Sequence, residues 1–212
     1  MSTRDYLEWH RPYDDPDSRL SHRLRAVQAQ LAAALDHHGD GARILSLCAG
    51  QGRDVIPVLA ERADVGASAV LVELDSRNAA IAEASAHDAG LESVRIICAD
   101  ASSPDNYRDA MPADIVLACG IFGNISDDDI RTTVEHLPSL CADGADVLWT
   151  RGRSAEHDLT PKIRGWFRDA GFEEIAFAAP LDERLSFTVG TQRLTAPPGP
   201  FEPGLRLFTF RR

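Results

Sequence analysis

The chain has 212 residues, of which 44% are hydrophobic and 26% are charged, so it can bury a core and fold as one domain. Acidic residues outnumber basic ones by 33 to 22, and the resulting net charge of -11 weighs against binding to nucleic acid or to an anionic membrane. No apolar run is long enough to cross a membrane, and the four cysteines, at positions 48, 98, 119 and 141, lie too far apart for a zinc motif or a disulfide framework. These features predict a cytoplasmic protein without a metal site, and no particular oligomeric state.

Residues 1–40 are expected to form an N-terminal segment that ends in an amphipathic helix. Apolar side chains recur there at steps of three and four residues: Leu20, Leu24, Val27, Leu31 and Leu35. Ser18 or Ser21 would cap the start of this helix, and Gly39 would end it. The remaining residues, 41–212, are expected to form the main part of the single domain.

From residue 41 to about residue 180, short apolar runs alternate with segments of helical period, which is typical of successive β-α-β units. Five of these runs predict parallel strands: Arg43–Leu47, Ala69–Leu74, Val94–Cys98, Asp114–Ala118 and Ala145–Thr150. Three later segments have strand composition and predict antiparallel closing strands: Glu173–Ala179, Ser186–Leu194 and Leu205–Phe210. The expected fold class is therefore α/β, with a doubly wound, mostly parallel seven-stranded sheet, helices on both faces and antiparallel C-terminal strands.

Two helices in the second half of the chain carry clear boundary signals. Ser126, followed by three aspartates, is a typical N-cap with acidic residues at the positive end of the helix dipole. Thr160 and Pro161 open another helix, and Gly171 is placed to end it. Asp75 is likewise expected to cap the helix that follows the second strand.

The first predicted strand runs into a glycine turn, Cys48-Ala-Gly-Gln-Gly52, at the start of a helix. Glycines here allow the backbone to approach a ligand closely, which favours a nucleotide-like ligand. Glu73 ends the second strand about 20 residues after Gly52, where an acid can accept hydrogen bonds from both ribose hydroxyls. The third glycine of the nicotinamide fingerprint G-x-G-x-x-G is replaced by Val55, which weighs against a nicotinamide cofactor.

With these motifs the sequence resembles the class I S-adenosylmethionine-dependent methyltransferases, whose first motif is a strand ending in an acid, followed by G-x-G-x-G. The stretch from Cys48 to Gly52 occupies that motif, and the resemblance extends over about residues 41 to 180. Two positions depart from the family pattern: Ser46 replaces the acid and Cys48 replaces the first glycine. The resemblance implies that residues 41–212 form a Rossmann-like cofactor-binding methyltransferase domain and that residues 1–40 form a lid over it.

The resemblance also implies the roles of individual residues. The glycine loop would hold the methionine and ribose parts of the cofactor, Glu73 would bind the ribose, Leu74 would flank the adenine, and Asp100 would meet the adenine amino group. The full set of expected cofactor-binding residues is Ala49, Gly50, Gly52, Glu73, Leu74, Asp100, Ala101 and Cys119.

The acceptor is expected where the fourth strand ends, and on loops over the carboxyl ends of the strands. The N/D-P-P-Y motif of enzymes that methylate nucleic-acid bases is absent there, which favours a small-molecule acceptor. Expected substrate-binding residues are Trp9, His10, Phe122, Asn124, Arg151 and Arg153. For an acceptor that must lose a proton, His157 is the expected general base and Tyr13 the group that orients it.

Two other functions remain open at this point. A noncatalytic module that binds S-adenosylmethionine or a nucleotide would fit the missing acid at Ser46 and the lack of an obvious base. A nicotinamide-dependent oxidoreductase would fit the glycine turn and Glu73 but not Val55.

Overall fold

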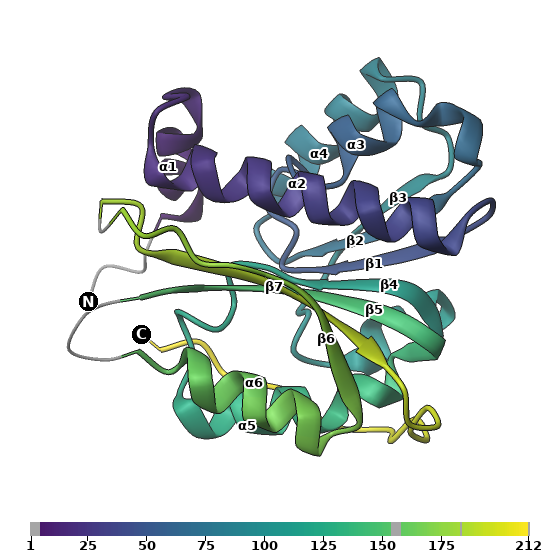
Figure 1. The fold of residues 1–212 in the computed structure, drawn as a ribbon. Coiled ribbons are helices and arrows are strands. Elements are labelled where there is room, and N and C mark those ends of the chain that lie inside the picture. The colour runs from purple at the N-terminus through teal and green to yellow at the C-terminus, as the bar shows by residue number, and fades with distance from the viewer. Residues whose placement is uncertain (1–4, 154–157, 183, 212) are drawn as a thin grey trace.

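The structure is a computed structural model that describes residues 5–153, 158–182 and 184–211. Its centre is one seven-stranded sheet in the order β3-β2-β1-β4-β5-β7-β6 (Figure 1). The strands are β1 (Arg43–Leu47), β2 (Ser68–Glu73), β3 (Val94–Cys98), β4 (Ala113–Ala118), β5 (Cys141–Gly152), β6 (Phe172–Ala178) and β7 (Phe187–Leu194). The first five are parallel, and β7 runs antiparallel to both of its neighbours, β5 and β6. The predicted doubly wound sheet with antiparallel C-terminal strands is confirmed.

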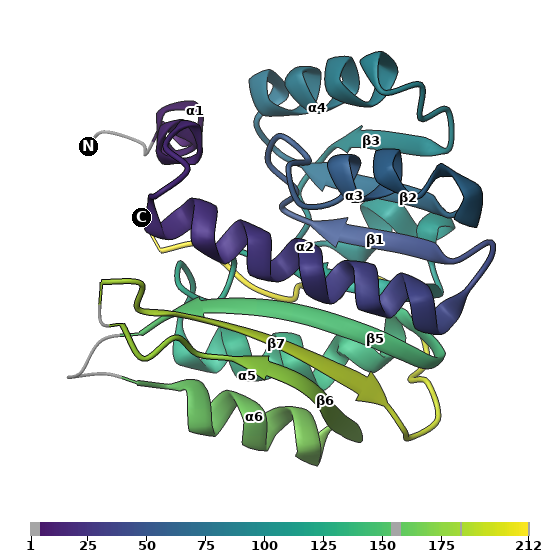
Figure 2. The ribbon, with the colours of Figure 1, turned by 45° about the horizontal axis from the view of Figure 1, so that its top comes forward.

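Helices cover both faces of the sheet (Figure 2). On one face lie α2 (Arg19–His38), α3 (Ile56–Glu61) and α4 (Ser76–Asp88), and on the other lie α5 (Asp127–His136) and α6 (Thr160–Asp169). Shorter elements are α1 (Tyr6–Trp9) and the 3-10 helices η1 (Arg11–Asp14), η2 (Ala63–Val65), η3 (Pro104–Ala110) and η4 (Leu137–Ser139). In the part of the chain that the structure describes, no helix combines the length and apolar character that crossing a membrane requires.

The predicted capping residues hold the helix ends. The Ser18 hydroxyl accepts a hydrogen bond from the Ser21 N–H at 3.1 Å, and the Ser126 hydroxyl accepts one from the Asp129 N–H at 3.0 Å. The Asp75 carboxylate likewise accepts from the Arg77 N–H at 3.0 Å. These bonds satisfy N–H groups that have no partner within the helix, and each contributes about 1 kcal/mol.

Each face of the sheet packs against its own apolar cluster. Leu31 and Leu35 of α2 pack with strand residues such as Leu71 on one side, and Phe167 of α6 packs with Trp149 on the other. The central strands β1 and β4 therefore face helices on both sides, which explains why their sequences are almost continuously apolar.

The prediction of a closing strand at Leu205–Phe210 is wrong. Phe210 forms only one isolated bridge, with Ile125, and the residues before it form no strand. Leu207 and Phe208 are neighbours in sequence and both are buried, whereas a strand would place them on opposite faces. The Leu207 N–H donates to the Ser102 carbonyl at 2.8 Å, and the Leu207 carbonyl accepts from the Thr133 hydroxyl at 2.9 Å, so the backbone is satisfied outside the sheet.

The strand order reverses between β1 and β4, since the chain winds outward from β1 through β2 to β3 and then returns to β4. In open α/β sheets such a switch point leaves a crevice at the carboxyl ends of the strands. The N-terminal elements α1 and η1 lie at that end of the molecule (Figure 2). The fold thus predicts a ligand site between these elements and the ends of β1, β2 and β4.

Candidate functional site

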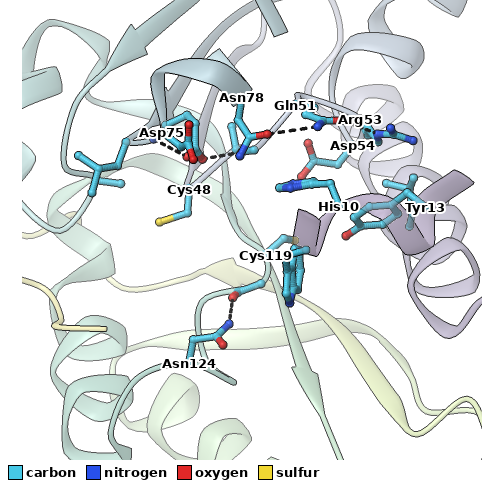
Figure 3. Close-up of a pocket in the computed structure, with 18 of the residues that line it drawn as sticks. His10, Tyr13, Cys48, Gln51, Arg53, Asp54, Asp75, Asn78, Cys119 and Asn124 are labelled. Atoms are coloured by element: carbon cyan, nitrogen blue, oxygen red, sulfur yellow. Dashed lines mark hydrogen bonds between the residues drawn. The ribbon is translucent and has the colours of Figure 1, made fainter. Parts of the chain in front are cut away.

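A cavity of about 340 Å³ occupies this crevice (Figure 3). Its floor is the loop after β1, with Cys48, Ala49 and Gly50. One end is formed by residues that follow β2 and β3, and the roof and the opposite end come from α1, η1 and the first turns of α2. This volume lies within the range of about 300–1,000 Å³ that is typical of small-molecule sites.

The loop after β1 has an unusual backbone. Cys48 has a φ of 54°, and it is the only residue other than glycine with positive φ in the described parts of the chain. Cys48 stands where the methyltransferases that this sequence resembles have a glycine. The cysteine therefore adopts the left-handed conformation that glycine would adopt freely. Gly50 follows with a φ of 57°. The sequence departs from the pattern at Cys48, but the backbone does not.

Glu73 joins the end of β2 to this loop. One carboxylate oxygen accepts a hydrogen bond from the Gly50 N–H at 2.8 Å, and the other accepts one from the Asp75 N–H at 2.8 Å. The Glu73 side chain lines the cavity and is buried. Each carboxylate oxygen can accept a second hydrogen bond, so Glu73 can hold the loop and still bind two ligand hydroxyls.

The residues after β2 and β3 form the end of the cavity that suits a planar base. Leu74 is 65% exposed although it is apolar, and it lies beside Asp100 and Ala101 on the wall. Asp100 accepts hydrogen bonds from the Ser102 N–H at 2.9 Å and from Arg206 at 3.1 Å. Burial alone would raise the pKa of Asp100, but these two bonds outweigh it and lower the pKa. The carboxylate is therefore charged and can accept a hydrogen bond from an amino group.

The N-terminal segment closes the cavity above the loop. A Cβ atom added to Gly50 would lie 2.3 Å from Nε2 of His10, so the imidazole rests directly on this glycine. Arg23 donates a hydrogen bond to the Tyr13 hydroxyl at 2.7 Å, and the Arg53 guanidinium lies 5.6 Å from the Tyr13 ring centre. Burial raises the pKa of Tyr13, so the phenol keeps its proton at neutral pH.

Asp54 stands out among the acids of the cavity. It follows the glycine loop, and Figure 3 shows its carboxylate pointing toward His10. Burial raises its pKa to about 6, and no hydrogen bond reaches the buried Oδ1 atom. Cys119, at the end of β4, lies close enough that the Asp54 charge adds to burial in raising the pKa of its thiol. The cysteine is therefore a neutral thiol at this point of the wall.

Comparison with known proteins places this site in a family. A sequence model described as "Putative methyltransferase" matches residues 18–154, which is more than half of the chain. The chain belongs to this methyltransferase family. No protein with a curated description matches the sequence.

Solved methyltransferases share the fold of this family member. Magnesium protoporphyrin IX methyltransferase from Synechocystis, solved with bound S-adenosylhomocysteine, gives a TM-score of 0.68 at 17% identity, over 90% of this chain and 94% of that one. The 1,6-didemethyltoxoflavin-N1-methyltransferase from Burkholderia thailandensis, solved with 1,6-didemethyltoxoflavin and S-adenosylhomocysteine, gives 0.64 at 19% identity, over 92% and 93%. A methyltransferase from Thiobacillus denitrificans, also solved with S-adenosylhomocysteine, gives 0.59 at 18% identity, over 81% and 91%. At these identities the likeness establishes the fold.

Most residues that the sequence indicated for the methyltransferase site do line the cavity. These are Trp9, His10, Tyr13, Ala49, Gly50, Glu73, Leu74, Asp100, Ala101, Cys119 and Asn124. Gly52 is not among the lining residues, because its Cα faces the apolar side chains of Ile56 and Leu71. Its role in this methyltransferase is to let the chain turn against the core.

Three expected substrate-binding residues lie elsewhere. Phe122 is fully buried in the core, with its ring centre 6.0 Å from that of Trp149 and 6.5 Å from that of Phe167. Arg151 donates a hydrogen bond to the Phe122 carbonyl, and Arg153 donates one to the Pro180 carbonyl at 2.6 Å. None of the three lines the cavity, and His157 lies outside the described residues.

The sequence reasoning missed Asp54 and Arg206. Asp54 directly follows a turn at the start of a helix, where an acid is ordinarily a solvated capping residue. Arg206 is more than 100 residues from Asp100 in the sequence, and no local pattern connects the two. The burial of Asp54 and the pairing of Arg206 with Asp100 both depend on segments that are distant in the sequence.

Proposed function

We propose that this protein transfers a methyl group from S-adenosylmethionine to a small organic acceptor in the cytoplasm. The observation that carries the proposal is that Glu73, the glycine loop and Asp100 line one cavity, within a chain that belongs to a methyltransferase family. The bound S-adenosylhomocysteine in the solved structures of the same fold supports the choice of cofactor. The small volume of the cavity and the net charge of -11 support a small molecule over nucleic acid as the acceptor.

The residues present fit this cofactor. Glu73 would accept hydrogen bonds from the ribose hydroxyls, Asp100 would accept one from the adenine amino group, and exposed Leu74 would pack against the adenine ring. When bound, S-adenosylmethionine supplies a methyl group already activated by the sulfonium. The protein has to align the acceptor with that methyl group and exclude water, and the N-terminal segment over the loop suits both tasks.

Acceptor groups that must lose a proton need a base. His157 is the proposed base and Tyr13 the proposed orienting group. Because Tyr13 remains protonated in its buried position, it would donate a hydrogen bond to the acceptor rather than remove a proton. Trp9, His10 and Asn124, which line the same cavity, are the proposed acceptor contacts.

Isothermal titration with S-adenosylhomocysteine tests the proposal. We expect micromolar binding to the unmodified protein and at least tenfold weaker binding to the Glu73→Gln variant, a loss of about 1.4 kcal/mol. Glu83→Gln, on the exposed face of α4, is the matched control and should bind as the unmodified protein does. A folded protein that binds NADH but not S-adenosylhomocysteine would instead support the nicotinamide alternative.

A further inference from the structure

One carboxylate of the cavity has a buried oxygen without a hydrogen-bond partner. Oδ1 of Asp54 is buried, and no hydrogen bond reaches it. A buried polar atom without a partner costs about 1–3 kcal/mol, more when it is charged, so such an atom in a native structure calls for an explanation. The position of Asp54 on the cavity wall indicates that its partner is a ligand.

The other three acids of the cavity already have partners. Glu73 holds the N–H groups of Gly50 and Asp75, Asp75 pairs with Arg77 at 2.6 Å, and Asp100 pairs with Arg206. The Asp54 carboxylate takes hydrogen bonds from the backbone N–H groups of Asp54 and Val55, but among the cavity acids within the described residues it alone has a buried oxygen, Oδ1, without a partner.

Nearby cations do not neutralise Asp54. Arg23 is close enough to lower the pKa of Asp54, but its Nη2 donates to the Tyr13 hydroxyl. Arg53, the preceding residue, donates to Asp14 at 3.1 Å and to Gln51 at 2.9 Å. A cationic group that enters the cavity would therefore find an anion ready to bind it.

The position of Asp54 in the cavity indicates which cationic group of a ligand would bind it. Glu73 marks the ribose end, and the glycine loop leads from there to Asp54. A cofactor with its ribose on Glu73 and its chain over the loop would extend its amino-acid end toward Asp54, with Arg23 nearby for the opposite charge. Ser46, which replaces the acid before the loop, is buried, and its hydroxyl carries no charge.

We infer that the Asp54 carboxylate binds the α-ammonium group of the methionine part of the cofactor, in place of the acid that Ser46 lacks. This inference rests on the proposed function. Asp54 is then a cofactor-binding residue, and the cost of its buried charge in the free protein is offset when the ammonium arrives. The ligand also replaces the missing hydrogen bond to Oδ1.

Titrations with three ligands test the charge directly: S-adenosylhomocysteine, its analogue without the amino group, and 5′-methylthioadenosine, which lacks the whole amino-acid end. For Asp54→Asn at pH 7.5 we expect S-adenosylhomocysteine to bind at least tenfold more weakly than to the unmodified protein. For each of the two other ligands, the dissociation constants for the unmodified protein and for Asp54→Asn should agree within twofold. Asp88→Asn, at the exposed end of α4, is the matched control.

The pH dependence of ligand binding is a second test, because it would not change if Asp54 had only a structural role. Four groups face Asp54 and could also titrate or alter the local charge: His10, Tyr13, Arg23 and Cys119. They are present in both proteins, so the ratio of the two dissociation constants isolates Asp54. We expect the ratio to be at least ten at pH 7.5 and to approach one as the pH falls well below 6. If Asp54→Asn does not fold, the preference of the unmodified protein for S-adenosylhomocysteine over the desamino analogue must decline over the same pH range.

The outcomes separate the two proposals. Equal binding of S-adenosylhomocysteine to the unmodified protein and to Asp54→Asn would overturn the inference and leave the proposed function standing. An equal loss for all three ligands would also overturn it, because Asp54 would then act on the shape of the site rather than on the ammonium. Failure of the folded, unmodified protein to bind S-adenosylhomocysteine would overturn the proposed function and this inference with it.

Discussion

The imidazole of His10 lies on the glycine loop, with its Nε2 only 2.3 Å from the position that a Cβ atom on Gly50 would occupy. The N-terminal segment and the loop are therefore fitted to each other at a place where any side chain would collide. In the sequence these two residues are far apart, and their contact closes the cavity over the ends of β1 and β4.

The first prediction concerns this contact. Gly50→Ala should destabilise the protein both through its φ of 57° and through the collision with His10. Gly66→Ala is the matched control, because Gly66 has a φ of 63° and no atom lies within 4 Å of an added Cβ. We expect urea unfolding to show a loss for Gly50→Ala that exceeds the control by about 1 kcal/mol or more. The excess should vanish when His10→Ala is combined with Gly50→Ala, and an excess that persists would contradict the collision.

The second prediction concerns the positive φ of Cys48. Cys48→Gly should fold with an unfolding free energy within about 1 kcal/mol of the unmodified protein, because relief of the left-handed strain offsets the lost side chain. Cys48→Val should lose about 1–3 kcal/mol, since a β-branched residue tolerates this conformation poorly. Cys141→Val, on strand β5, controls for the change of side chain at an ordinary backbone. Equal losses at positions 48 and 141 would show that the backbone conformation is not the cause.

The third prediction is that Asp54 lowers the stability of the free protein. Burial raises its pKa to about 6 from the usual 3.8, so the folded state holds this proton more tightly than the unfolded state. The resulting penalty is complete above pH 6, amounts to at most about 3 kcal/mol, and disappears as the pH falls toward 4. Asp54→Asn should therefore raise the unfolding free energy at pH 7.5, and the difference should shrink to near zero at pH 4. A pH-independent difference between the two proteins would contradict this account.

The fourth prediction separates core packing from ligand contact at Phe122. Because its ring is fully buried against Trp149 and Phe167, Phe122→Leu should lower the unfolding free energy by about 1 kcal/mol. The dissociation constant of S-adenosylhomocysteine should stay within twofold. Unchanged stability together with altered ligand binding would instead show that Phe122 contacts the ligand.

Signals that act over a few residues were sufficient to predict most of the fold. Ser18, Ser126 and Asp75 cap helices because the N–H groups they satisfy lie two or three residues away in the sequence. The strands that carry the site were also predictable, since burial on both faces requires continuous apolar runs. Leu205–Phe210 has the same composition but does not join the sheet, because the Leu207 backbone is hydrogen-bonded to Ser102 and Thr133, which lie far from it in the sequence.

The site was predictable where its residues belong to one local pattern. Ala49, Gly50 and Glu73 follow from the ends of neighbouring strands, which any sheet of this order brings together. Phe122 and Asp54 were beyond such reasoning, because their surroundings are set by distant segments. Trp149 and Phe167 enclose the first, and Tyr13 and Arg23 lie against the second. A lone phenylalanine or aspartate carries no mark in the sequence of how deeply it will be buried.

The position of β7 determines when the sheet can be completed during synthesis. This strand, close to the C-terminus, lies between β5 and β6 and pairs with both. It also meets α2, near the N-terminus, where the Thr191 hydroxyl donates to the Gln30 side chain at 2.6 Å. During synthesis, β5 therefore has an open edge and α2 lacks part of its packing surface until residue 194 has left the ribosome. The native sheet is therefore completed only after β7 has been made, and until then the unpaired edge of β5 is open to pairing with another polypeptide.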